Sequence, residues 1–357
     1  MNKGATANGV KDYDRFIHRK ILYLGILGIL FLAVALISLC IGPTNLSVTE
    51  VLDILFHKDD TWNSYVVWDL RLHRIVAAII AGVALGSAGA VMQCVLRNPL
   101  GSPFTLGISN AAAFGAALGI IILGGGTILG QSVATPQVDN PYIVTISAFV
   151  MAMLSAGVIV LLVRITHSSP EMMVLAGMAL SSIFSAGLAF LQYIANDTAL
   201  SAIVFWQFGS LSKATWGDLT LTAMVVAIVS LYFLSKRWDY NAMDTGEDIA
   251  LGLGINVGST RVLGMVLASV STAVVVSFMG VIGFIGLLGP HMARWVFGND
   301  NRYVIPASML IGSTILMVAD CIGQNAFSFV LPVGILTSFI GGPLFIYILI
   351  RRYRERC

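Results

Sequence analysis

Long uncharged stretches alternate with short polar breaks along the chain, and most are long enough to cross a bilayer as a helix. About 20 apolar residues at ~1.5 Å each span the ~30 Å hydrocarbon core. The pattern therefore predicts an all-α, polytopic membrane protein. The nearly uncharged stretches cover residues 21–42, 75–96, 104–124, 142–163, 172–195, 219–235, 262–290, 303–319 and 330–350.

The seventh stretch, residues 262–290, is too long for a single span. Its 29 residues would extend roughly 43 Å as one helix. Gly280, Gly283 and Gly286 lie in its second half and weaken a continuous helix there. We therefore divide it into spans over 262–279 and 281–298, which makes ten predicted transmembrane helices.

Basic residues gather at both ends of the chain. Residues 1–20 hold five Lys or Arg and residues 351–357 hold four Arg. Basic short segments stay on the cytoplasmic side, so both tails are predicted to be cytoplasmic, which requires an even number of spans. The predicted organisation is a tail over 1–20, a membrane domain over 21–350 and a tail over 351–357. The domain includes a long cytoplasmic loop at about 237–261.

The composition agrees with a membrane protein. Hydrophobic residues make up 57% of the chain and charged residues only 11%, whereas soluble domains are about a quarter charged. The four cysteines, Cys40, Cys94, Cys321 and Cys357, form no CxxC pair. The sequence therefore suggests neither a disulfide framework nor a zinc site.

Catalytic and metal-binding motifs are missing from the sequence. There is no GxxxxGK[ST] phosphate-binding loop and no HExxH pair. Acidic residues fall in loops or at span ends, and Asp320 comes closest to a membrane-embedded carboxylate. An ion-coupled carrier usually needs such a group. We therefore expect no catalytic residue, no metal site and no cofactor in this chain, and an energy source in another one.

Two arginines at the outer start of the second span run against the charge bias. Arg71 and Arg74 are three residues apart, and so neighbours on one face of a helix. They could pair with Asp69 or with lipid phosphates, or they could dock carboxylates of an external protein.

Three inner features each leave two alternatives open. Gln93 lies at membrane depth and could either bond to another helix or line a wet path. Ser168 and Ser169 could form a plain turn or an inner gate. The loop with Gly246, Glu247 and Asp248 could be a solvated connector or a surface that receives force from an ATPase.

The second span and a later one suggest a weak internal repeat. Gly82, Gly86 and Gly89 give the second span a small-residue face that allows close helix packing. This span opens at Arg74 and leads to Asn98-Pro99, and another opens at Arg261 and leads to Gly289-Pro290. Because these spans run in opposite directions, they predict inverted repeats, although two short matches could also be coincidence.

Several spaced motifs together resemble the permease subunits of ABC importers for iron–siderophore complexes, haem and cobalamin. Residues 70–74 resemble the family's Arg-Leu-Pro-Arg opening, with His73 where proline is usual. Residues 93–109, 246–254, 283–294, 319–320 and 331–335 resemble further family motifs. The matching motif residues are Asn98, Pro99, Gly107, Ser109, Gly283, Gly286, Pro290, His291, Arg294, Asp320, Pro332 and Gly334.

This resemblance implies ten helices, a second permease subunit of the same or a related chain, two ATPase subunits and an extracytoplasmic binding protein. It places Arg71 and Arg74 against glutamates of the binding protein. A third family arginine falls at Gln324, which cannot supply the charge. The implied coupling segment comprises Gly246, Glu247, Asp248, Ala250, Leu253 and Gly254.

The sequence thus favours a multi-pass permease of the plasma (inner) membrane that contacts lipid, binds no nucleic acid and imports a metal chelate, haem or corrinoid. An ion-coupled secondary transporter with inverted repeats is the alternative. A membrane scaffold or sensor without transport is a third hypothesis.

Overall fold

The computed structural model describes residues 3–42, 44, 46–123, 140–166, 170–326 and 328–354, and every regular element in these residues is helical. The elements are α1 (Lys3–Cys40), α2 (Val48–Phe56), α3 (Trp62–Tyr65), the π-helix η1 (Val66–Leu72), α4 (His73–Val95), α5 (Ile108–Ile121), α6 (Pro141–Thr166), α7 (Pro170–Ile194), α8 (Asp197–Gln207), α9 (Trp216–Ser235), α10 (Arg237–Thr245), α11 (Glu247–Gly252), α12 (Val257–Met279), α13 (Ile285–Phe297), α14 (Asn301–Asn325) and α15 (Val333–Arg354).

Helix α4 forms the centre of the bundle because small residues let neighbouring backbones approach it. It packs against α14, α12 and α13, and most of its side chains are buried. A Cβ added at Gly82 or Gly86 would collide with the α14 backbone at Ser313 or Ser308, and one at Gly89 with the carbonyl of Gly286. The small-residue face expected from the sequence is therefore the contact surface with α13 and α14.

The long seventh stretch does break at the expected glycine. Helix α12 ends at Met279, and Gly280 has φ +77°, a conformation that favours glycine. Helix α13 begins five residues later at Ile285. The split expected near residue 280 is therefore confirmed.

Seven helical segments among the described residues are long and apolar enough to cross a membrane. Helices α5 and α13 have only 14 and 13 residues, and the described apolar part of α15, Val333–Tyr347, is also short. Length and composition alone therefore do not establish ten spans. The seven segments are Asp14–Cys40, Trp62–Val95, Pro141–Leu162, Met172–Ile194, Trp216–Ser235, Val257–Met279 and Asn301–Asn325.

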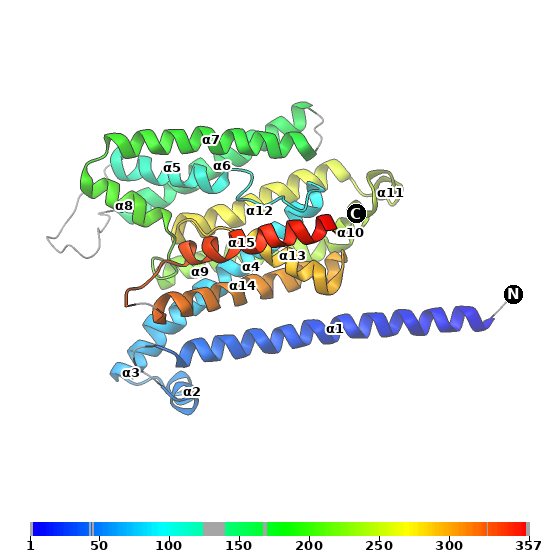
Figure 1. Ribbon diagram of the computed structural model, residues 1–357, viewed down its shortest axis with the longest axis horizontal. Coiled ribbons are helices and arrows are strands. Elements are labelled where there is room, and N and C mark those ends of the chain that lie inside the picture. The colour runs from blue at the N-terminus through cyan, green and yellow to red at the C-terminus, as the bar shows by residue number, and fades with distance from the viewer. Residues whose placement is uncertain are drawn as a thin grey trace.

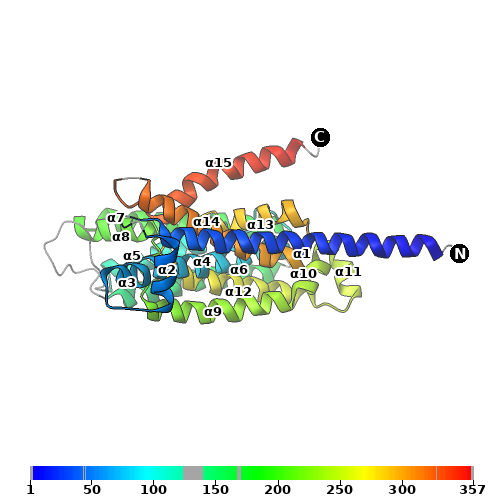
Figure 2. The same cartoon turned by 90° about the horizontal axis from the view of Figure 1, so that it is seen from below.

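The first helix is longer than the sequence indicated. Residues 3–20, expected as a tail, continue the first span as one helix, and α1 extends past the rest of the bundle (Figures 1 and 2). Along its apolar part exposed and half-buried positions alternate, because one side of α1 packs against α14 and the other side is open. It therefore forms an edge of the bundle.

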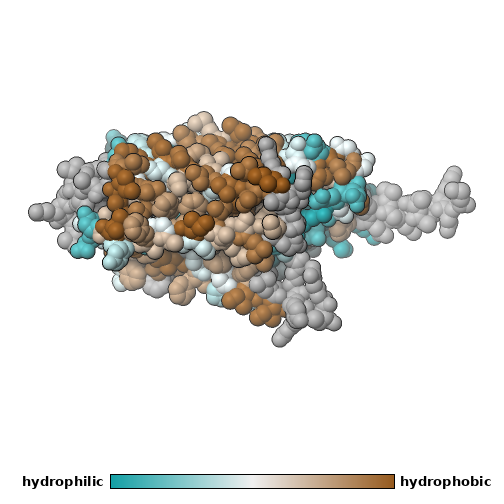
Figure 3. Space-filling view, turned by 90° about the horizontal axis from the view of Figure 1, so that it is seen from above, coloured by the Kyte–Doolittle hydropathy of each residue, from teal (hydrophilic) through white to brown (hydrophobic). Residues whose placement is uncertain are grey.

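The bundle has two distinct ends. Helices α10 and α11, the start of α1 and the end of α15 lie at one end, here named the inner end (Figure 1). Helices α2, α3 and α8 lie at the opposite, outer end. Apolar side chains form a broad band between the two ends, and hydrophilic residues gather at the inner end (Figure 3).

Candidate functional site

At the outer end, Arg74 is paired with Asp320 across two helices. The Arg74 Nε donates to Asp320 Oδ2 at 3.0 Å and its terminal nitrogen donates to Oδ1 at 2.6 Å. Gln324 donates its amide to the same carboxylate at 2.5 Å. Asp320 is thus a span-end carboxylate satisfied by a neighbour, and it neutralises one of the two outward arginines.

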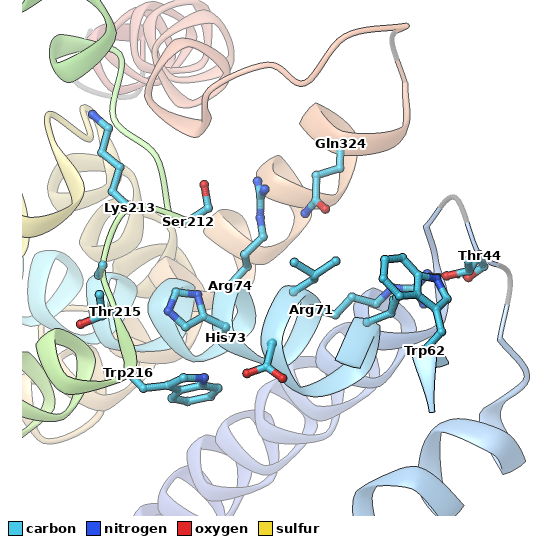
Figure 4. A pocket seen from close by; sticks show the side chains of 14 residues that line it. Thr44, Trp62, Arg71, His73, Arg74, Ser212, Lys213, Thr215, Trp216 and Gln324 are labelled. Carbon is cyan, nitrogen blue, oxygen red and sulfur yellow. Dashed lines mark hydrogen bonds between the residues drawn. The ribbon is translucent and has the colours of Figure 1, made fainter. Parts of the chain in front are cut away.

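Arg71 has a different environment from Arg74, although the sequence placed them on one helix face. Its guanidinium is buried and donates to the carbonyls of Leu39 and Cys40 at 2.7 and 3.0 Å and to Thr44 Oγ1 at 3.0 Å. The π-helical turns of η1, which contain Arg71, change the helical register before α4 begins. Arg71 therefore holds the end of α1, while Arg74 reaches α14 (Figure 4).

A cavity of about 630 Å³ opens between these arginines and the segment before α9 (Figure 4). Three cationic side chains, Arg71, Arg74 and Lys213, line it against one carboxylate, Asp69. Lys213 donates to the carbonyls of Phe205 and Trp206 at 3.1 and 3.3 Å at the end of α8. With Arg74 paired to Asp320, Arg71 and Lys213 still outnumber Asp69, so the cavity carries an excess of positive charge and suits an anionic group. Trp62, Trp216, His73 and Gln324 complete much of its wall.

At the inner end, Glu247 joins three parts of the chain. It accepts a hydrogen bond from Arg261 at the start of α12 and lies 3.6 Å from Arg97, just after α4. Arg261 also donates to the carbonyl of Val95 at 3.1 Å, and Arg97 to that of Met243 at 3.2 Å. The hydrogen bond from Arg261, with the nearby charges of Arg261 and Arg97, holds the pKa of Glu247 below its usual range.

Helices α10 and α11 form the segment that the sequence identified as the coupling loop. Gly246 joins them with φ +146°, which other residues rarely adopt. Ala250 is buried beneath the segment, while Asp248 and Gly254 are exposed. The large apolar side chains of Ile249, Leu251 and Leu253 point away from the bundle core and are exposed.

Gln93 bonds to the helix that carries His291 and Arg294. Its amide lies 3.3 Å from His291 Nδ1 and accepts from Arg294 Nε at 3.4 Å. Gln93 and His291 are buried, and Gln93 also lines a cleft of about 700 Å³ at the inner end. The bonds fit the helix-bonding alternative for Gln93, and its place in the cleft fits the alternative of a wet path.

A second inner cluster was not singled out from the sequence. Asp300 accepts from Arg302 and Asn241, and these hydrogen bonds outweigh its burial and hold its pKa well below the usual range. Asn301 donates to Asp244 at 2.7 Å. The polar run at 299–302 was the available signal, but its partners lie about 60 residues away on α10.

The remaining motif residues shape turns and helix contacts. Asn98 and Pro99 make the turn after α4, Gly107 precedes α5 and Ser109 is buried in it. Gly283 lies in the break before α13. Gly286 and Pro290 lie on α13, and Pro332 and Gly334 lie at the start of α15. Ser168 and Ser169 lie outside the described residues.

Comparison with known proteins places these features in a family. Residues 30–351 match the FecCD transport family. The ABC transporter permease protein MJ0087 of Methanocaldococcus jannaschii is 45% identical over 97% of this chain and 99% of its own length. The hemin transport system permease protein HmuU of Yersinia pestis is 31% identical over 94% of this chain and 97% of its own.

A solved structure shares the fold. A metal-chelate type ABC transporter in an inward-facing conformation gives a TM-score of 0.79 at 30% identity, and the match covers 92% of this chain and 99% of that one. The family match spans most of the sequence, and the relatives match along nearly their whole length. The chain therefore belongs to the FecCD transport family of ABC transporter permeases.

Proposed function

We propose that this chain is the membrane permease subunit of an ATP-driven importer in the plasma (inner) membrane. A second permease of the same or a related chain, two ATPase subunits and an extracytoplasmic binding protein complete the assembly. The cargo is an iron–siderophore complex, haem or a cobalamin-type ligand, a class to which the hemin permease among the relatives points. The chain itself carries no cofactor in this proposal.

Ten membrane crossings with both termini cytoplasmic belong to the same proposal. The start of α1 and the end of α15 lie at the inner end (Figures 1 and 2), which favours an even number of crossings. The seven long segments are an odd number, and the shorter apolar helices α5 and α15 bring the number to nine. Counting the 13-residue α13 as a further crossing gives ten.

Inverted repeats fit two matching helix pairs. Helix α4 has 23 residues and is followed, after a turn, by the 14-residue α5. Helix α12 also has 23 residues and leads to the 13-residue α13. Helix α4 runs from the outer to the inner end and α12 runs back, so the two pairs would be related by inversion.

The observation that carries the proposal is the coupling segment at the inner end. Short helices α10 and α11 present Ile249, Leu251 and Leu253 to solvent, while Glu247 ties them to the ends of α4 and α12. An exposed apolar patch on a polar surface, here formed by Ile249, Leu251 and Leu253, indicates a protein partner. A movement of this patch would be transmitted directly to α4 and α12, as an ATPase-driven permease requires.

The outer cavity supports delivery by a binding protein. Its excess positive charge suits a carboxylate from a docked protein. Arg74 is already paired with Asp320, and Arg71 bonds carbonyls in the α1–α2 region. Lys213 is exposed and donates to two neutral backbone carbonyls, which leave its charge uncompensated, so we assign it to receive the partner together with the outer face of Arg74.

Reconstitution tests the function. The tagged chain is isolated with its co-purifying subunits, placed in proteoliposomes with internal ATP, and supplied externally with its binding protein and labelled ferric siderophore, haem or cobalamin. We expect uptake of one cargo class that requires ATP and survives a protonophore. Uptake driven by an ion gradient without nucleotide would instead identify a secondary carrier and overturn the proposal.

The coupling segment is tested by Leu253→Asp, with Leu253→Met as the matched control of similar size. Placing a charge on the apolar patch should lower both the amount of ATPase that co-purifies and the rate of uptake, because the buried contact with the partner is lost. Leu253→Met should retain both. Equal ATPase recovery with the two variants would contradict the coupling role.

The docking site is tested by Lys213→Glu, with Lys58→Glu as control, since Lys58 is also an exposed outer lysine but does not line the cavity. Only Lys213→Glu should weaken binding-protein affinity, and the difference should shrink in high salt. Unchanged affinity at low salt would argue against docking at this cavity.

A further inference from the structure

The outer helix α2 is amphipathic in an unusual way, because it shows three different faces. Val51 and Ile54 are buried against the bundle. Thr49, Glu50 and Asp53 form an exposed polar face. Val48, Leu52 and Phe56, each four residues apart, form an exposed apolar stripe with exposures of 46%, 40% and 81%.

The placement of α2 is fixed by contacts with the neighbouring helices. Trp68 of η1 donates its indole N–H to the carbonyl of Ile54 at 3.2 Å. Arg71 donates to Thr44 in the segment between α1 and α2. Glu50 closes a capping box with Ser47 at the start of α2. The apolar stripe is therefore presented in one orientation.

The location of α2 points to lipid as its occupant. It lies beside the outer end of α1, on the side of α1 that faces away from the bundle (Figures 1 and 2). The apolar side of α1 is itself exposed along its span, up to Ile37 and Ile41 near its outer end. The stripe thus lies at the outer boundary of an already lipid-exposed surface.

A nearby aromatic residue fits the same depth. Tyr65, at the outer start of the second span, is exposed and does not line the outer cavity. Amphipathic aromatic rings favour the level of lipid head groups. The stripe itself carries no charge, and none of its three residues lines the outer cavity. Both features favour lipid over a docked protein.

We infer that α2 lies in the leaflet at the outer end, with Val48, Leu52 and Phe56 inserted among the upper acyl chains and Glu50 and Asp53 facing water. Such a helix lies in the plane of the interface rather than across the membrane. The hydrogen bond from Trp68 to Ile54 of α2, and the bond from Arg71 to Thr44 just before α2, would then fix the outer ends of α1 and α4 at a defined depth. The inference requires only that the chain spans a membrane and does not depend on the proposed cargo or partners.

Site-specific photocrosslinking tests this placement. The amino acid p-benzoylphenylalanine is introduced at position 52, 56 or 53 of the full chain, which is placed in nanodiscs of phosphatidylethanolamine and phosphatidylglycerol. Mass spectrometry then measures lipid adducts on the α2 peptide. Positions 52 and 56 should give several-fold more lipid adduct than position 53, the matched control on the polar face of the same helix.

Two outcomes would overturn the inference. Equal adduct yields at the three positions would show that the stripe is no closer to lipid than the polar face of α2. Crosslinking of positions 52 and 56 to another protein in native membranes would make the stripe a protein interface. Hydrogen exchange of residues 48–56 gives a second readout that does not need the photoprobe. Phe56→Ser should speed exchange of α2 in nanodiscs, whereas Asp53→Ser should leave it unchanged, and equal effects would also count against lipid insertion.

Discussion

The ion pair between Arg74 and Asp320 is expected to hold α4 to α14 at the outer end. The two side chains are 15% and 9% exposed and share two hydrogen bonds of 3.0 and 2.6 Å. At an effective dielectric constant of about 20, unit charges ~4 Å apart attract by about 4 kcal/mol. Removing one partner leaves the other charge buried and unpaired, which typically costs about 3–5 kcal/mol.

Asp320→Asn should therefore lower the free energy of unfolding by about 3 kcal/mol, the lower end of this range, because asparagine keeps one acceptor oxygen. Arg74→Gln should cost a similar amount. The double variant should cost little more than either single change, so the cycle should yield a coupling energy close to about 3 kcal/mol. Unfolding in mixed micelles with increasing dodecyl sulfate, followed by tryptophan fluorescence, measures these differences.

Asp60→Asn is the control, since Asp60 is an exposed carboxylate of the outer segment, and it should change stability by less than about 0.5 kcal/mol. Additive losses in the double variant would show that the two residues do not interact in the folded protein. The pairing described for the outer end would then be refuted, and Arg74 would be a free cation.

Three further predictions follow from other contacts. Gly89→Ala should lower the free energy of unfolding by about 2 kcal/mol or more through overpacking, because the added Cβ would collide with the Gly286 carbonyl. Gly28→Ala is the control, since a Cβ at Gly28 meets open space and should not destabilise the protein. Equal effects of the two changes would contradict the close helix contact. Arg71→Gln should increase proteolytic cleavage between α1 and α2 by releasing the carbonyls of Leu39 and Cys40, and unchanged cleavage would count against that anchoring role. The pKa of Glu247 is lowered in the folded protein, so the ionised carboxylate stabilises the fold above the usual pKa of 4.5, and this contribution is lost only as the pH falls through the lower folded pKa. Hydrogen exchange of α10 and α11 should therefore stay slow at pH 5. Arg261→Gln should speed the exchange of these helices at neutral pH.

The sequence pattern predicted the features that depend on local composition. Gly280 lies where the overlong stretch breaks, and Gly82, Gly86 and Gly89 lie where α4 meets α13 and α14. Such features can be read locally because a helix break or a small-residue face is set by residues a few positions apart.

Features that depend on distant pairing were not predicted. Arg74 and Asp320 are 246 residues apart in the chain, and nothing near either residue indicates the other. The π-helical turns of η1 separate Arg71 from Arg74 although their spacing suggests a shared face. The ordered helices α2 and α8 replace what reads as outer loop, because their stability comes from packing against the bundle rather than from a strong local pattern.

The contacts of α4 indicate how inner and outer ends communicate. Its outer end is held by Arg74 to α14, its middle touches the α14 backbone at Gly82 and Gly86, and its inner end receives Arg261 at the Val95 carbonyl. Because α4 is tied to α14 at its outer end and packs backbone to backbone against it in the middle, it cannot slide past α14 without losing several of these contacts at once. We therefore expect α4 and α14 to move as one body during transport. Distances between spin labels on these two helices should stay constant with and without ATP, while distances to α7 or α15 change; a changing α4–α14 distance would refute this rigid-body view.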